Sequence, residues 1–182
     1  MKIKDLPNKL IIRNVELLDP LKEKVYKGNV LLVDGKIAGL GKFHQPADAK
    51  SIDFEGLTLT HGFCDLHVHF REPGDEDKET LRSGSMAALS GGFTRVCTMP
   101  NTSPPIDSPE SINFIIEKSR DCPVHIHPIG AVTKGQKGIE ISEMGLMKQA
   151  GAIAFSDDGL PIQNGLVMRK ALEYSKMLNV PV

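Results

Sequence analysis

The 182 residues of this chain are about enough for one domain, and a composition of 40% hydrophobic and 25% charged residues is that of a globular protein. Its 22 basic and 23 acidic side chains nearly cancel, which argues against a nucleic-acid partner because such binding needs a basic excess. No apolar run approaches the roughly 20 residues of a membrane span, and the first ten residues lack the pattern of a secretory signal. We therefore expect a cytoplasmic protein that does not bind membranes.

The cysteines support the same interpretation. Cys64, Cys97 and Cys122 are odd in number and far apart in the sequence. This spacing argues against a disulfide framework and predicts three buried free thiols in a reducing compartment.

Residues 1–60 predict a small β-rich module of the sandwich type. Apolar runs at 29–33 and 36–41 flank the pair Asp34 and Gly35. A two-residue Asp-Gly connection between apolar runs is typical of a β-hairpin. No residue of this module is a candidate for catalysis.

From residue 61 the pattern changes to a repeated strand, loop and helix. The predicted strands are 62–70, 93–100, 123–132 and 152–158. The predicted helices follow them at about 81–89, 109–119, 140–150 and 168–178. Such alternation implies a parallel sheet with right-handed crossovers.

The repeat of about 30 residues suits either an open doubly wound sheet or a (β/α)8 barrel. No glycine-rich phosphate loop follows the first strand, which disfavours the dinucleotide-binding form of the open sheet. A barrel typically takes ~250 residues. We therefore expect an α/β fold in which residues 61–182 are the truncated N-terminal half of a TIM-type barrel. This half holds the first four to five βα units, and a fifth strand opens at 179–182.

Two histidines at the end of the first predicted barrel strand are candidates for metal binding. Side chains of a strand alternate between faces, so His67 and His69 point the same way, with Arg71 in line behind them. Paired neutral imidazoles suit a zinc-type ion. The alternative is a pair of structural histidines, and Asp65 together with the turn at 72–74 favours the metal site.

An aspartate at the end of the fourth predicted strand could join them. Ile153 and Phe155 share a face with Asp157, and their bulk should pack against helices. This leaves Asp158 facing the barrel axis, although a bulge at the strand end would bring Asp157 there instead.

Two further polar features lie on or directly after predicted strands. His125 and His127 repeat the spacing of the first pair, but apolar residues follow them, so we interpret them as structural, with His127 at the border of the site as the alternative. Asn101 follows the second strand, where an amide can donate to and accept from a substrate, although Pro-Asn is also an ordinary turn sequence.

Taken together, these motifs resemble those of dihydroorotases, in the bacterial-type branch of the amidohydrolase superfamily. The resemblance rests on the segments DLHVHFREPG (65–74), GGFT (91–94), MPNT (99–102) and FSDDG (155–159). It covers essentially the whole chain in order, including the β-rich module before the barrel.

The resemblance implies reversible cyclisation of N-carbamoyl-L-aspartate to dihydroorotate in pyrimidine biosynthesis, with one or two zinc ions. It implies that His67, His69 and Asp158 are metal ligands. It also implies that His69, Arg71 and Asn101 bind the substrate, the last two through its carboxylate. A planar guanidinium fork suits a carboxylate in a way that lysine does not.

The resemblance further implies two more histidine ligands and an aspartate general base beyond residue 182. We therefore expect the 182 residues alone to be inactive. Two other functions stay open: a non-catalytic partner of aspartate carbamoyltransferase, and an allantoinase- or hydantoinase-like ring amidase. Besides a small-molecule substrate, the expected partners are further copies of the chain or aspartate carbamoyltransferase.

Overall fold

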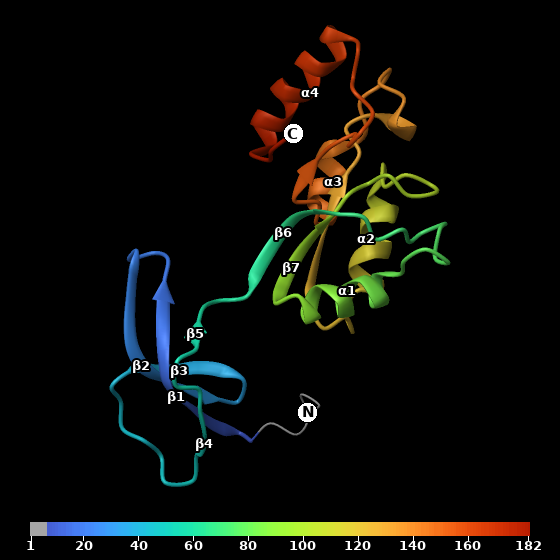
Figure 1. The fold of residues 1–182 in the computed structure, drawn as a ribbon. Helices are drawn as coiled ribbons and strands as arrows, with labels where there is room; N and C mark the ends of the chain where they lie inside the picture. Colours follow the sequence, from blue (N-terminus) through green and yellow to red (C-terminus); the bar gives the residue numbers. More distant parts are fainter. Residues whose placement is uncertain (1–6) are drawn as a thin grey trace. The chain divides into compact units, whose positions relative to one another are not determined.

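The computed structural model describes residues 7–182, which fall into two compact units with a boundary between His61 and Gly62 (Figure 1). Residues 1–6, on which part of the expectation about a secretory signal rests, lie outside the described residues. No helix in the described range is long and apolar enough to cross a membrane.

The first unit contains one β-sheet of five strands. They are β1 (Lys9–Asp19), β2 (Lys24–Val33), β3 (Lys36–Gly41), β4 (Lys50–Asp53) and β5 (Thr58–Leu59). The strand order is β3-β2-β1-β4, and β5 pairs with β1. The sandwich-type arrangement of this module stays a prediction.

The predicted hairpin between β2 and β3 is confirmed. The two strands pair in antiparallel fashion, with Val33 opposite Lys36. Asp34 and Gly35 between them have φ angles of 49° and 74°. Positive φ at both central residues matches the right-handed twist of paired strands, which is why Asp-Gly is favoured there.

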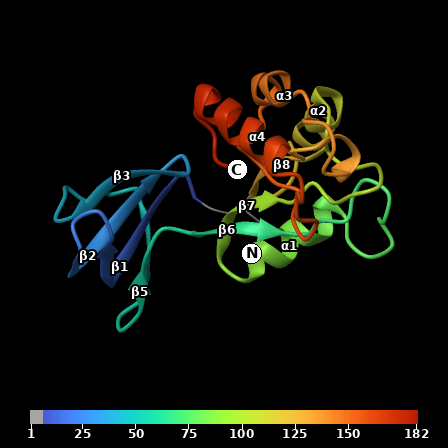
Figure 2. The same ribbon diagram turned by 90° about the horizontal axis from the view of Figure 1, so that it is seen from above.

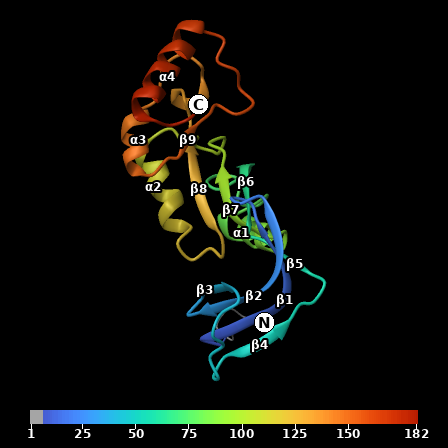
Figure 3. The ribbon, with the colours of Figure 1, turned by 90° about the vertical axis from the view of Figure 1, so that its left-hand side faces the viewer.

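The second unit contains four parallel strands in the order β6-β7-β8-β9. They are β6 (Phe63–Val68), β7 (Phe93–Thr98), β8 (His125–Gly130) and β9 (Ala154–Phe155). Each is followed by a helix: α1 (Leu81–Ser90), α2 (Pro109–Lys118), α3 (Met144–Ala150) and α4 (Gly165–Leu178). The helices α2 and α3 lie side by side in Figures 2 and 3.

The strand order distinguishes the two predicted architectures. In a doubly wound sheet the order reverses at a switch point, whereas in a barrel each strand lies next to its predecessor. Here the spatial order follows the chain, as in the first four units of a barrel. The Phe155 N–H donates to the Pro181 carbonyl over 3.0 Å, so the chain begins to run beside β9 where a fifth strand was expected.

Capping residues set the helix starts. Thr80 and Ser108 each accept a hydrogen bond from the main chain three residues later, and Pro109 occupies the first turn of α2. The third helix starts at Met144 rather than near residue 140, because the Ser142 N–H donates to the Val132 carbonyl instead of entering the helix.

The main core lies between the sheet and its helices. It includes Val96, Ile126 and Phe155 from the strands. Phe70 is also buried there, on the opposite side from the paired histidines as expected, and packs against α1 where Gly84 leaves room for its ring. A Cβ at Gly84 would lie 2.3 Å from the Phe70 ring.

Two expectations about this unit are wrong. The fourth strand is two residues long rather than 152–158, because the chain after Phe155 turns towards the end of β8. Of the cysteines, Cys97 is buried as predicted, but Cys122 is only partly buried and Cys64 is exposed. Cys64 lies on β6, which in this structure is an edge strand of the sheet.

We predict that Phe155→Ala destabilises the protein by about 3–5 kcal/mol, the usual cost of emptying a fully buried aromatic site. Phe155 is 1% exposed and fills the space beside Gly130 and Met147. Urea denaturation followed by circular dichroism measures the change. Leu166→Ala, at a site 59% exposed, is the control and should change the free energy of unfolding by less than about 0.5 kcal/mol.

Candidate metal centre

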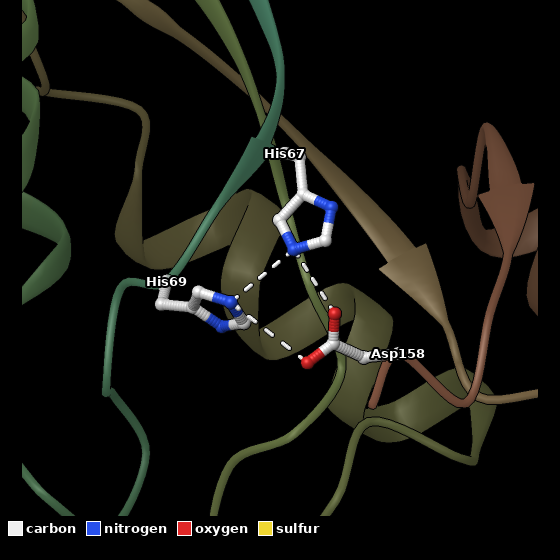
Figure 4. Close-up of side chains that lie close together, drawn as sticks. All are labelled: His67, His69 and Asp158. Carbon is white, nitrogen blue, oxygen red and sulfur yellow. Dashed lines mark hydrogen bonds and ion pairs between the residues drawn. The ribbon is translucent and has the colours of Figure 1, made fainter. Parts of the chain in front are cut away.

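Two imidazoles meet at the carboxyl end of β6 (Figure 4). His67 is the next-to-last residue of the strand, and His69 follows its end directly. Their Nε2 atoms are 3.3 Å apart, and the rings stand nearly perpendicular at 70°. Both rings therefore present the same nitrogen to one shared space, as the alternation of the strand predicted.

The carboxylate of Asp158 reaches this space from the segment after β9 (Figure 4). Its Oδ1 lies 3.0 Å from His67 Nε2, and its Oδ2 lies 3.8 Å from His69 Nε2. The Asp158 side chain is 13% exposed. One ligand atom from each of the three residues lies within 4.8 Å of the others, close enough for all of them to bind one ion.

Asn101, after β7, connects the two sides of this cluster. Its Nδ2 donates to Asp158 Oδ2 over 2.7 Å, and its Oδ1 lies 2.9 Å from His69 Nδ1. An amide oxygen accepts, so Nδ1 of His69 carries the proton and Nε2 keeps its lone pair for a ligand. Such partners commonly orient metal-binding histidines.

The donor set fits a zinc-type ion. Two neutral imidazole nitrogens and one carboxylate oxygen are the ligand types that zinc binds, and three protein ligands leave a coordination position open. Among the described residues, this is the group of three His, Cys, Asp or Glu side chains whose ligand atoms lie this close together. His67, His69 and Asp158 can therefore hold one such ion.

The structure brings Asp158, and not Asp157, to the imidazoles. Asp157 is 5% exposed and accepts hydrogen bonds from the segment after β8. The size argument holds for Phe155, which packs against helices, but not for Ile153, which is 39% exposed. Strand alternation alone does not explain the outcome, because Asp158 lies outside β9 and has a left-handed φ of 51°.

Arg71 lies on the loop between β6 and α1, three residues after the strand ends. Its side chain is partly buried and forms no hydrogen bond or ion pair with any residue in the range 7–182. The loop that carries it contacts the loop that carries Asn101, since the Ser103 N–H donates to the Pro73 carbonyl over 3.0 Å. A guanidinium fork is thus free for a ligand on the same edge of the sheet.

Glu72, which was not predicted as a site residue, anchors the loop between β6 and α1. Glu72 is 2% exposed, accepts the N–H of Leu81 over 2.8 Å at the start of α1, and forms an ion pair with Lys118 of α2. An acidic side chain is favourable at a helix N-terminus. The signal was present as an acidic residue shortly before a predicted helix.

The second histidine pair lies outside the cluster. The rings of His125 and His127 are stacked at 28°, and His127 Nε2 lies 3.3 Å from Arg95 Nη1. Burial, together with the Arg95 charge, lowers the pKa of His127 and keeps it neutral near pH 7. Burial likewise raises the pKa of the Cys97 thiol to about 11, so this thiol is neither a nucleophile nor a ready ligand.

The parallel strands follow one another in the order of a barrel, and the candidate metal centre lies at their carboxyl ends. These features define the class of protein as a (β/α) barrel, of which this chain is a part. In that fold, active sites lie at the carboxyl ends of the strands. Residues 56–181 match the family described as "Dihydro-orotase-like". The chain belongs to this family.

Curated relatives agree with this assignment. The chain is 47% identical over 174 residues to a protein named dihydroorotase from Pelotomaculum thermopropionicum, covering 96% of this chain and 41% of the relative. It is 43% identical over 175 residues to one of the same name from Aquifex aeolicus, covering 96% and 42%. The chain thus spans about two fifths of the length of these relatives.

Solved structures confirm the fold class. The L-hydantoinase (dihydropyrimidinase) from Arthrobacter aurescens matches with a TM-score of 0.74 at 20% identity, over 96% of this chain and 40% of that one. The dihydropyrimidinase from Brevibacillus agri NCHU1002 matches with 0.72 at 22% identity, over 94% and 38%. At these identities the likeness establishes a shared fold, namely a β-rich module followed by part of a (β/α) barrel.

We predict that Asp158→Asn weakens the binding of a zinc-type ion by more than about 100-fold, which is the upper end of the effect of losing an outer partner of a ligand. The amide loses the negative charge that such an ion favours. Competition with a chromophoric chelator measures the affinity. Asp121→Asn, at an exposed carboxylate remote from the cluster, is the control, and equal weakening by both variants would contradict a role for Asp158 as ligand.

Proposed function

We propose that the protein is a zinc-dependent cyclic amidohydrolase, a dihydroorotase that interconverts N-carbamoyl-L-aspartate and dihydroorotate in pyrimidine biosynthesis in the cytoplasm. The observation that carries the proposal is the convergence of His67, His69 and Asp158 in a chain of the dihydro-orotase-like family. The curated relatives named dihydroorotase support the choice of substrate.

The three converging side chains would hold one zinc ion. When bound, zinc polarises the ring amide carbonyl and activates water for attack on it. Asn101 keeps His69 in the tautomer whose Nε2 is free to bind, and its Nδ2 fixes one oxygen of Asp158. A second ion would need ligands beyond the described residues, which contain no other such group.

Arg71 would bind the carboxylate of the substrate. Its guanidinium is not engaged by any described residue, and Glu72 holds its loop against α1. A bidentate pair with a carboxylate is short and directional, so it would orient the ring with its amide towards the cluster. His69 and Asn101 lie on the same side of the cluster and complete the proposed substrate contacts.

Proton transfer to the leaving nitrogen needs a general acid or base within hydrogen-bond reach. Of the two neighbouring aspartates, Asp158 is committed to the cluster and Asp157 is turned away into the protein. We therefore place this group, and further histidine ligands, outside the described residues.

A hydantoinase-like ring amidase is the second candidate. The solved structures named hydantoinase and dihydropyrimidinase share the fold, which supports ring-amide chemistry in general. Their rings, hydantoin and dihydrouracil, lack the carboxylate that Arg71 would bind, and this favours dihydroorotate. The filled ligand positions argue against a purely structural partner of aspartate carbamoyltransferase, and assembly with that enzyme or with further copies stays a prediction.

The full-length protein, loaded with zinc, should hydrolyse dihydroorotate and form it from N-carbamoyl-L-aspartate, with little turnover of hydantoin or dihydrouracil. Ultraviolet absorbance at fixed substrate concentration measures each reaction. Residues 1–182 alone should show no turnover, because the proton carrier is missing. A preference for rings without the carboxylate would replace this proposal by the second candidate.

We predict that Arg71→Lys raises the KM for dihydroorotate about tenfold or more and leaves zinc affinity within about twofold. Lysine keeps the charge but cannot form two parallel hydrogen bonds to a carboxylate, a loss of roughly 1.5–3 kcal/mol. Steady-state kinetics and a chelator competition separate the two effects. An unchanged KM would remove Arg71 from the proposed carboxylate site.

A further inference from the structure

Asp157 is a buried carboxylate that the proposed reaction does not use. It is 5% exposed and directly precedes the candidate ligand Asp158. A carboxylate is costly to bury unless its oxygens are hydrogen-bonded. The hydrogen-bond donors to Asp157 therefore indicate its role.

All three donors to Asp157 come from the segment directly after β8. Its Oδ1 accepts the N–H groups of Val132 over 2.8 Å and Thr133 over 3.1 Å. Its Oδ2 accepts the Thr133 hydroxyl over 2.5 Å. Thr133 is fully buried, and its hydroxyl oxygen in turn accepts the N–H of Gly138 over 2.9 Å.

No cation among residues 7–182 pairs with Asp157. Its charge is balanced by neutral donors that are held in the protein interior. Hydrogen bonds to an ionised acceptor are stronger than those between neutral groups. The carboxylate thus ties the chain after β9 to the chain after β8 at a fixed distance.

This connection matters because regular sheet pairing ends early here. The strand β9 is two residues long, and the last main-chain bond to β8 runs from the Ser156 N–H to the Gly130 carbonyl over 2.9 Å. Beyond it, Asp158 has a left-handed φ of 51°, a main-chain conformation that is less favourable for a residue with a side chain than for glycine.

The Asp158 main chain is held by the two residues before it. Its N–H donates to the Ser156 hydroxyl over 2.9 Å, and the anchored Asp157 precedes it. The carboxylate of Asp158 then meets His67 and Asn101.

We propose that Asp157 is a positioning residue: its hydrogen bonds to Val132 and Thr133 hold the main chain so that the Asp158 carboxylate lies beside the two imidazoles. The inference rests on the proposed metal-dependent function. Asp157 itself does not touch the ion or the substrate.

The test uses the full-length protein and one disruptive change at each end of the connection. Asp157→Ala removes the acceptor, and Thr133→Val removes the hydroxyl donor with little change of shape. Both should weaken zinc affinity, measured by chelator competition, by about 10- to 100-fold, the range typical of residues that orient ligands. Thr133→Ser keeps the hydroxyl and should retain affinity within about threefold of the unchanged protein.

A double-mutant cycle and a spectrum distinguish positioning from general destabilisation. Asp157→Ala combined with Thr133→Val should weaken zinc binding little more than either change alone, because both break the same connection. The visible absorption bands of the Co²⁺-substituted protein should shift in both single variants. Ile112→Val, which shortens a fully buried core side chain of α2, is the stability control and should leave zinc affinity and Co²⁺ bands unchanged.

Unchanged zinc affinity and Co²⁺ bands in a folded Asp157→Ala or Thr133→Val variant would overturn the inference. Equal weakening by Ile112→Val would do the same, because the effect would then follow from stability alone. If the unchanged protein binds zinc but does not hydrolyse dihydroorotate, the proposed function fails and the positioning role is still decided by the affinities. Absence of zinc binding in the unchanged protein overturns both.

Discussion

The arrangement of the site depends on one carboxylate placed between two imidazoles. Asp158 comes from the segment after β9, while His67 and His69 come from the end of β6, with β7 and β8 between these two strands in the sheet. Bringing a carboxylate and two imidazoles together at a partly buried site costs free energy unless hydrogen bonds or a bound ion satisfy their polar atoms. Asn101 satisfies part of this demand by contacting both sides, and a zinc-type ion would satisfy the rest.

The polar loops around this site are fixed by buried carboxylates rather than by long strands. Glu72 holds the loop between β6 and α1 through the start of that helix, and Asp157 holds the chain after β9 to the chain after β8. Loops at this edge carry functional residues and lack sheet pairing of their own. A few strong, buried hydrogen bonds therefore fix the positions of these loops, as main-chain pairing fixes the strands of the sheet.

Fold and specificity are separate questions in this protein. The same half-barrel occurs in solved structures named hydantoinase and dihydropyrimidinase, at about one fifth sequence identity. The relatives named dihydroorotase are about twice as similar in sequence. The fold alone therefore does not specify a substrate. Under the proposed function the loops at the carboxyl ends of the strands carry the groups that do, and Arg71 is the candidate among the described residues.

The sequence by itself determined the four βα units, the Asp34-Gly35 hairpin, and the pairing of His67 with His69. These features depend on local rules, namely alternation in strands, helical periodicity and the chemistry of turns. Only the tertiary structure decided that Asp158 rather than Asp157 meets the imidazoles, that Asn101 joins His69 to Asp158, and that Asp157 is hydrogen-bonded to the chain after β8. Those outcomes depend on hydrogen bonds between segments 24 to 57 residues apart or on a left-handed main chain outside any strand, and no local pattern specifies either.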